Sequence, residues 1–202
     1  TNRQDPPPPI EAVAPGGGES WGIDARLKRW PVAYFSEFIQ TIGKQYPFLF
    51  KPILILGGSG EYELGEQLLK NLRGQVLRPV PNECGIYNLC GKVSIRVAAA
   101  LIQKAQLLVG NDGGLIHIAH AVGTPVIAFY GPTDPVVYGP YPAKDTALVI
   151  AKSGPICRPC YQRFKYQAAC QGVECLTELA PSQVLEHIRK SRFLEQLMAV
   201  AE

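Results

Sequence analysis

The 202-residue sequence has no long apolar run, no large excess of charge of one sign and a single methionine, Met198. A transmembrane helix needs about 20 consecutive apolar residues, which this sequence does not offer, and no signal-peptide pattern opens it. Its 20 basic and 17 acidic residues give a formal net charge of +3, too small and too scattered for a dedicated nucleic-acid-binding protein. We therefore expect no transmembrane segment and no nucleic-acid partner.

The sequence has enough apolar material for a folded domain. Hydrophobic residues make up 47% and charged residues 18% of it, an ordinary globular composition. It opens with TNRQDPPPPI and lacks an initiator methionine, and a proline run favours a stiff, extended conformation. We predict an interdomain linker remnant over residues 1–9, one domain over residues 10–190 and a C-terminal helix over residues 191–202.

Short apolar runs alternate with amphipathic segments about five times along the chain. The expected strands are residues 10–14, 52–56, 106–109, 125–130 and 146–151. One expected helix begins at Pro31. The other expected helices cover residues 61–72, 94–104, 115–122, 181–190 and 192–201. Continuous apolar strands are typical of a parallel sheet covered on both faces. The pattern predicts an α/β fold with a doubly wound, Rossmann-like parallel sheet.

Glycine-rich loops follow three of the strands. They are PGGG, which contains Gly16 and Gly17, GGSGE at residues 57–61, and GNDGG at residues 110–114. Open α/β sheets bind ligands at the carboxyl ends of their strands, and glycine lets backbone amides approach a phosphate closely. We therefore expect a nucleotide or another phosphorylated ligand, although neither GxGxxG nor GxxxxGK[ST] is present.

The segment GNDGGLIHIAH carries the most specific candidates. Asp112 is expected to cap the following helix, which leaves the amides of Gly113 and Gly114 to face an anion. His117 lies three residues after Gly114 and could donate to a phosphate oxygen. His120 is expected to have a structural role.

Two further pairs of residues could either contact a ligand or only stabilise local backbone structure. Thr133 and Asp134, in the turn GPTDP, either bind ligand hydroxyls or only form the turn. Glu61 and Glu63 either cap a helix or accept hydrogen bonds from a sugar hydroxyl.

A basic cluster lies before Trp30. Lys28 and its basic neighbours are either a solvent-exposed face or bring one cation to the ligand edge, where it would offset the charge of a diphosphate. The surrounding stretch RLKRWPVAYF could alternatively contact a membrane or an acceptor molecule.

Four of the six cysteines crowd into one segment, at Cys157, Cys160, Cys170 and Cys175. Four thiolates can complete a tetrahedral zinc site. The alternatives are a loop of free thiols or a disulfide. We expect no metal, and zinc remains the minor alternative.

The motifs DGGLIHIAHAVGTPVIAFYGPTDP, PGGGESWG…RLKRWP and CRPC…CLTELAPSQV together closely resemble the C-terminal domain of glycosyltransferase family 9, the ADP-heptose:lipopolysaccharide heptosyltransferases. The resemblance spans residues 10 to 190. It implies the C-terminal half of a GT-B fold, which binds a nucleotide-sugar donor, in an inverting enzyme that transfers a heptose or related sugar, expected from ADP-heptose, to lipopolysaccharide or another glycan.

The resemblance also implies roles for single residues. Gly113, Gly114 and His117 would hold the diphosphate, beside a loop shaped by Asp112, and Lys28 would stabilise the leaving group. Glu61 or Glu63 would contact the ribose or sugar. The family has Ser or Thr where this chain has Gly113, which removes one hydroxyl donor.

The general base of the family belongs to the N-terminal half, so we expect this chain alone to bind donor weakly and transfer nothing. We expect no required cofactor, and dependence on a divalent cation stays open. The glycan or lipid-linked acceptor would bind through the other half, in the cytoplasm or peripherally at the inner membrane. The alternatives are a nucleotide-sugar epimerase-like GT-B domain and a non-catalytic, zinc-stapled interaction module.

Overall fold

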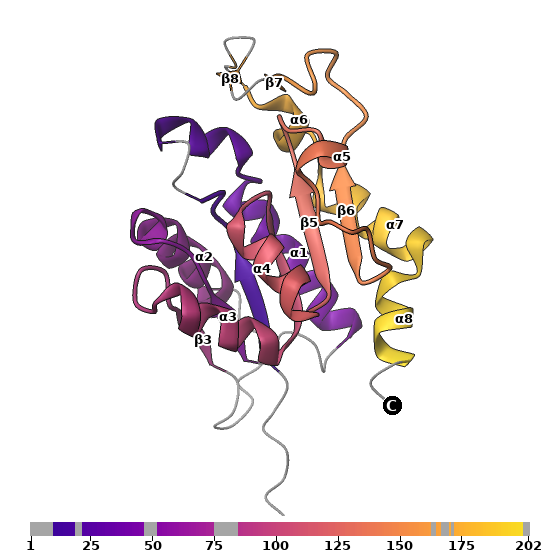
Figure 1. The fold of residues 1–202 in the computed structure, drawn as a ribbon. Coiled ribbons are helices and arrows are strands. Elements are labelled where there is room, and N and C mark those ends of the chain that lie inside the picture. The colour runs from indigo at the N-terminus through magenta and orange to yellow at the C-terminus, as the bar shows by residue number, and fades with distance from the viewer. Residues whose placement is uncertain are drawn as a thin grey trace, which may run out of the picture.

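The computed structural model describes residues 10–18, 22–46, 52–74, 85–162, 165–166, 170 and 172–199. Its centre is a six-stranded parallel sheet in the order β3-β2-β1-β4-β5-β6, drawn among its helices in Figure 1. The strands are β1 (Ile10–Ala14), β2 (Ile53–Ile55), β3 (Ile86–Asn88), β4 (Ala105–Asn111), β5 (Val126–Tyr130) and β6 (Ala147–Ala151). The predicted doubly wound α/β fold is confirmed.

Helices cover both faces of this sheet. The core on one face contains residues of α1 (Val32–Gln45), α2 (Tyr62–Gly74), α7 (Pro181–Ser191) and α8 (Phe193–Ala199). The core on the other face contains residues of α3 (Ile95–Lys104) and α4 (Gly114–Val122). Most strand residues are apolar because both faces of the sheet are buried against helices, and Glu11 of β1 is a buried exception.

The aromatic residues behind the basic cluster form part of the core. Trp30 is fully buried, stacks on Phe129 with ring centroids 4.3 Å apart, and meets Phe35 edge to face. Its indole Nε1 donates to the carbonyl oxygen of Leu179 at 2.8 Å. The stretch RLKRWPVAYF therefore does not offer these rings to a membrane or an acceptor, and that alternative is wrong for them.

Most predicted elements are present, and the structure adds several short elements that the sequence did not predict. Ser94 caps α3 by accepting from the amide of Val97, as expected. The sequence did not indicate β3, the 3-10 helices η1 (Gly22–Lys28) and η2 (Ser59–Glu61), α5 (Pro135–Tyr138), β7 (Tyr161–Gln162), β8 (Lys165–Tyr166) or α6 (Glu174–Thr177). These pieces have seven residues or fewer, which is too short for a periodic pattern.

The ends of the chain add two observations. The predicted linker over residues 1–9 lies outside the described residues. The last helix begins at Phe193, after Arg192 in the left-handed region at φ 56°. Across the described ranges, no helix is both long and apolar enough to cross a bilayer.

Candidate functional site

The candidate site lies where the strand order reverses. β1 has β2 on one side and β4 on the other, so the chain leaves β1 and β4 in opposite directions and opens a crevice at their carboxyl ends. The loops at residues 15–18 and 112–114 flank this crevice, and Gly57 and Gly58 follow the neighbouring strand β2. This is the edge at which the glycine loops were predicted to meet, and the structure brings all three together.

A cavity of 330 Å³ opens at this edge. Ligand sites of small molecules typically enclose about 300–1,000 Å³. Loops and η2 contribute glycines and Glu61 to its wall, whereas α3, α4 and Leu56, which follows β2, contribute apolar side chains. The lining residues are Ala14, Gly16, Gly18, Leu56, Gly57, Gly58, Glu61, Val93, Ile95, Ala98, Asn111, Gly113, Gly114 and Leu115.

The structure separates the two candidate glutamates. Glu61 is 3% exposed and lines the cavity, and its two carboxylate oxygens accept hydrogen bonds from the amides of Gly18 at 2.9 Å and Gly58 at 2.8 Å. Glu61 thus joins the loop after β1 to the loop after β2. Glu63 is exposed in the first turn of α2 and does not line the cavity.

Asn111 is a site residue that the sequence analysis missed. It is 1% exposed at the end of β4. Its side-chain oxygen accepts from the amide of Trp30 at 3.0 Å, and its amide nitrogen donates to the carbonyl of Pro15 at 2.7 Å. One side chain therefore fixes both the PGGG loop and the residues that follow Lys28. Its position inside GNDGG was the only available signal.

Asp112 does not cap α4, so that prediction is wrong. The N-cap is Gly113, and no side chain accepts a capping bond there. The carboxylate of Asp112 is buried instead, where its Oδ2 accepts from the hydroxyl of Thr133 at 2.8 Å and faces Nζ of Lys28 at 3.7 Å. These partners come from distant parts of the chain, and their pull on the carboxylate outweighs the local capping bond.

Lys28 ends η1 and is 4% exposed. Burial lowers the pKa of its ammonium group below the ordinary 10.5, and the charges of Asp112 and Glu61 oppose that shift only in part. Lys28 is therefore held against a carboxylate and not spread on a solvent-exposed face. It is not among the residues that line the cavity, so its contact with a ligand stays a prediction.

The glycines of the two facing loops approach each other closely. A Cβ atom on Gly113 would lie 3.2 Å from the carbonyl carbon of Gly17, whereas one on Gly114 would meet nothing within 4 Å. A Cβ on Gly16 would lie 1.7 Å from Oε1 of Glu61. The family's Ser or Thr at position 113 would thus need the PGGG loop to move by a few tenths of an ångström.

The two histidines take different positions on α4. His117 is exposed on the first turn of α4 and is not among the residues that line the cavity, so its contact with a phosphate stays a prediction. His120 is buried, and its Nε2 lies 2.8 Å from the carbonyl oxygen of Pro142. The structural role expected of His120 is confirmed.

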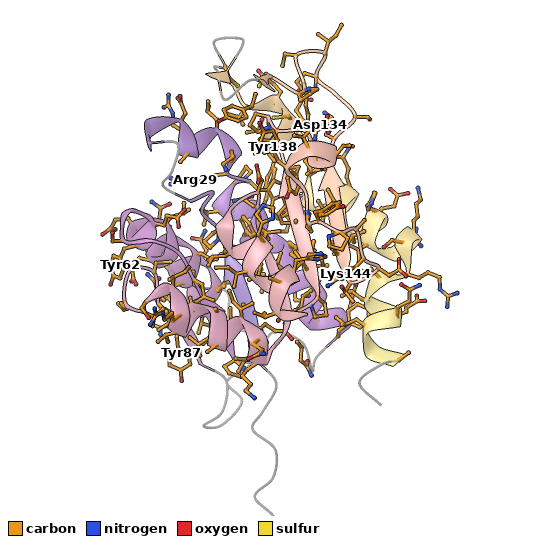
Figure 2. The ribbon with its side chains drawn as sticks, viewed as in Figure 1. Arg29, Tyr62, Tyr87, Asp134, Tyr138 and Lys144 are labelled. Atoms are coloured by element: carbon orange, nitrogen blue, oxygen red, sulfur yellow. The ribbon has the colours of Figure 1, made fainter. Side chains whose placement is uncertain are left out.

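The GPTDP residues are engaged in local structure. The hydroxyl of Thr133 is fully buried and bonds to Asp112, and the carboxylate of Asp134 caps α5 by accepting from the amide of Val136 at 2.9 Å. Figure 2 shows Asp134 and Tyr138 together above the carboxyl end of β5. These contacts favour the turn alternative, and a ligand contact of either residue stays a prediction.

The four clustered cysteines are free thiols. Cys157 is exposed, Cys170 is intermediate, and Cys160 and Cys175 are buried. Burial raises the pKa of Cys160, and it raises the pKa of Cys175 to about 12. Among the described residues, which include all four, no group of three or more His, Cys, Asp or Glu is placed to hold a metal ion. The expected absence of a metal stays a prediction, with zinc as its minor alternative.

Comparisons with known proteins point to one family. The model of "Glycosyltransferase family 9 (heptosyltransferase)" matches residues 20–168. Lipopolysaccharide heptosyltransferase 2 of Salmonella typhimurium is 26% identical over 163 residues, which cover 80% of this chain and 42% of the relative. Lipooligosaccharide heptosyltransferase 2 of Campylobacter jejuni is 28% identical over 174 residues, which cover 86% of this chain and 49% of the relative. The chain thus spans about half the length of the curated relatives it matches.

Solved structures share the fold. The E. coli ADP-heptose lipopolysaccharide heptosyltransferase II superposes with a TM-score of 0.61 at 22% identity, over 95% of this chain and 48% of that one. The E. coli heptosyltransferase WaaC with ADP gives a TM-score of 0.59 at 20% identity, over 93% of this chain and 45% of that one. Since the family model covers most of the sequence, the chain belongs to glycosyltransferase family 9, the heptosyltransferase family.

Proposed function

We propose that this chain is the donor-binding part of an inverting glycosyltransferase that transfers a heptose, or a related sugar, from ADP-heptose to a lipopolysaccharide or other glycan acceptor. The observation that carries the proposal is the cavity at the β1/β4 switch point, with backbone amides of three glycine loops on one side and an apolar wall on the other. The names of its relatives, lipopolysaccharide and lipooligosaccharide heptosyltransferases, support the same reaction class.

The two sides of the cavity suit the two ends of a nucleoside diphosphate. Leu56, Val93, Ile95 and Leu115 offer an apolar surface for a flat nucleobase. Gly113 and Gly114 begin α4, where free amides and the helix dipole favour an anion by about 0.3–1 kcal/mol, and more when the site is partly buried. A diphosphate bound at these amides would lie next in sequence to Asp112, the carboxylate that Lys28 faces.

Lys28 would act on the charge that develops when the sugar leaves. In direct displacement at the anomeric carbon, the acceptor oxygen forms a bond as the bond to the diphosphate breaks, so negative charge grows on the leaving group. An ammonium group held in a buried position stabilises that charge without rearranging solvent. The arriving diphosphate also favours the charged form of Lys28, which burial disfavours in its absence.

We propose that His117 completes the phosphate contacts from the rim. It is exposed one turn into α4, so its ring can turn toward a ligand without breaking a buried contact. Glu61, which lines the cavity with both oxygens bonded to backbone amides, would face the ribose or sugar.

The acceptor and the general base would belong to the other half of the full-length enzyme. Glu61 is the only carboxylate lining the cavity within the described ranges, and both of its oxygens already accept backbone hydrogen bonds. This argues against the epimerase alternative as well, because an epimerase needs acid and base groups of its own beside the sugar.

Calorimetric titration with ADP tests the site. We expect wild-type protein to bind, Lys28→Met to lose at least tenfold in affinity, and His117→Ala to lose less, because its ring is solvent-exposed. Lys190→Met is the matched control, since Lys190 pairs with Glu186 on the exposed face of α7. Equal affinities in all four proteins would overturn the site assignment.

A further inference from the structure

We infer that Arg158 is a positioning residue for the anion-binding edge: from the CRPC segment (residues 157–160) it holds the turn at residues 131–133, and through that turn the Asp112–Lys28 pair. The role of this pair toward a diphosphate rests on the proposed function, whereas the mechanical connection does not. This gives the cysteine-flanked arginine a task that the proposed function left unassigned.

Within the described ranges, the guanidinium of Arg158 makes three hydrogen bonds, all to backbone carbonyls. Its Nε donates to Gly131, its Nη2 to Thr133 at 3.3 Å and its Nη1 to Lys152 at 2.8 Å. None of the ion pairs within the described part of the chain includes Arg158. The guanidinium fork is thus used to join backbone segments, a geometry that the single ammonium group of lysine cannot reproduce.

The backbone of the same segment completes the attachment. The amides of Cys160 and Tyr161 both donate to the carbonyl of Pro132, at 3.0 and 3.1 Å. Three successive carbonyls, those of residues 131, 132 and 133, therefore accept hydrogen bonds from residues 158–161. This turn lies between the end of β5 and the start of α5, which Figure 1 shows at the carboxyl end of β5.

The turn passes its position on to the anion site. The Thr133 hydroxyl donates to Oδ2 of Asp112 at 2.8 Å, and the same oxygen faces Nζ of Lys28 at 3.7 Å. Thr133 is 0% exposed and Asp112 is 5% exposed. Because water has little access to these groups, breaking the hydrogen bond between them costs free energy. A shift of the turn therefore reaches Lys28 through two contacts of defined geometry.

A ligand-free experiment tests the connection first. Lys28 is buried, so acetylation by an N-hydroxysuccinimide ester should be slow, as followed by mass spectrometry relative to exposed Lys190. We expect Arg158→Met and Arg158→Lys to raise the Lys28 rate about tenfold, because contacts of this kind couple by about 0.5–3 kcal/mol. Arg192→Met, which removes an exposed arginine paired with Glu195, is the matched control and should leave the rate unchanged.

Thermal unfolding of each variant separates this effect from a general loss of structure. If Arg158→Met accelerates the acetylation of every lysine equally, or leaves Lys28 as slow as in wild type, the positioning role is overturned. A selective rise at Lys28, with the other lysines unchanged, supports it.

Ligand affinities then distinguish a role at the phosphates from a structural one. We expect Arg158→Met to weaken ADP about tenfold in NMR titrations while adenosine, which lacks phosphates, changes less than twofold. In a Thr133→Val background the Arg158 substitution should cost no further ADP affinity, because the connecting hydroxyl is already gone. Equal losses for ADP and adenosine, or additive losses in the double variant, would overturn the proposal. Wild-type protein that binds no ADP would refute the proposed function alone, and the acetylation result would still decide the role of Arg158.

Discussion

Lys28 and Asp112 form a buried ion pair, which we expect to contribute more to ligand binding than to stability. Their side chains are 5% and 7% exposed and their charged atoms are 3.7 Å apart. Removing two charges from water costs several kcal/mol per ion, and the attraction between them often does no more than offset that cost. A buried ion pair with little net stabilisation is consistent with a site that binds a third charge, the diphosphate of the donor.

This account predicts opposite effects on stability and on binding at the residue scale. Replacing the pair by Lys28→Met together with Asp112→Asn should leave the free energy of unfolding unchanged or raise it by about 1–4 kcal/mol, while ADP affinity is lost. Lys28→Met alone should lower it by about 3 kcal/mol, because Asp112 would remain buried without its cation. Urea unfolding at pH 7 measures both values.

The pH dependence of the same variants has a defined sign. Because burial lowers the pKa of Lys28 in the folded state below 10.5, the unfolded chain binds more protons between those two pKa values. Wild-type stability attributable to Lys28 therefore rises with pH through that window. The stability advantage of the double variant should shrink as the pH rises from 7 toward 10.5, and an advantage that grows with pH would contradict the assignment.

At the scale of elements, the carboxylate of Glu61 joins the loop after β1 to the loop after β2. Its oxygens hold the amides of Gly18 and Gly58, and a Cβ on Gly16 would lie 1.7 Å from Oε1. Gly16→Ala must therefore displace the carboxylate. Hydrogen bonds to charged groups contribute about 1.5–3 kcal/mol each, so we expect a loss of about 2–4 kcal/mol in unfolding free energy.

Gly43 provides the matched control for this substitution. It lies inside α1, and an added Cβ meets nothing within 4 Å. Gly43→Ala should raise the unfolding free energy by about 0.5–1 kcal/mol, since alanine favours a helix over glycine. Similar effects of both substitutions in chemical denaturation would mean that the Glu61 carboxylate moves aside freely.

The long elements could be predicted from the sequence because their signals are local. β4, β5 and α3 follow from apolar runs, helical spacing and a serine cap within a few residues. The role of Asp112 could not be predicted. The sequence shows a carboxylate before two glycines, but it does not show that Thr133 and Lys28, which lie 21 and 84 residues away, contact that carboxylate. Glu61 and Glu63 were equally plausible for a related reason. Two residues apart near a helix start, they point to different sides, and only the tertiary contacts decide which side faces the cavity.

At the scale of the whole molecule, the six-stranded sheet gathers its glycine loops around one cavity. The strand order places β1 and β4 at the switch point, and the helices on both faces support the loops that line the cavity. Within the described ranges, no carboxylate of the cavity other than Glu61 could take a proton from an acceptor. Binding and transfer should therefore be separable in this chain.

Thermal unfolding with and without nucleotide, combined with an assay for ADP release, measures that separation. ADP at 100 times its Kd should stabilise the folded state by about 2.7 kcal/mol, which raises the Tm by about 5–10 °C for a domain of this size. The double variant Lys28→Met, Asp112→Asn should show no such shift. ADP-heptose with a lipopolysaccharide acceptor should yield no ADP above background from this chain, because the group that deprotonates the acceptor is expected elsewhere in the full-length enzyme. ADP release at an enzymatic rate would place that group within these 202 residues, and an exposed side chain at the rim, such as His117, would then be the first candidate to substitute.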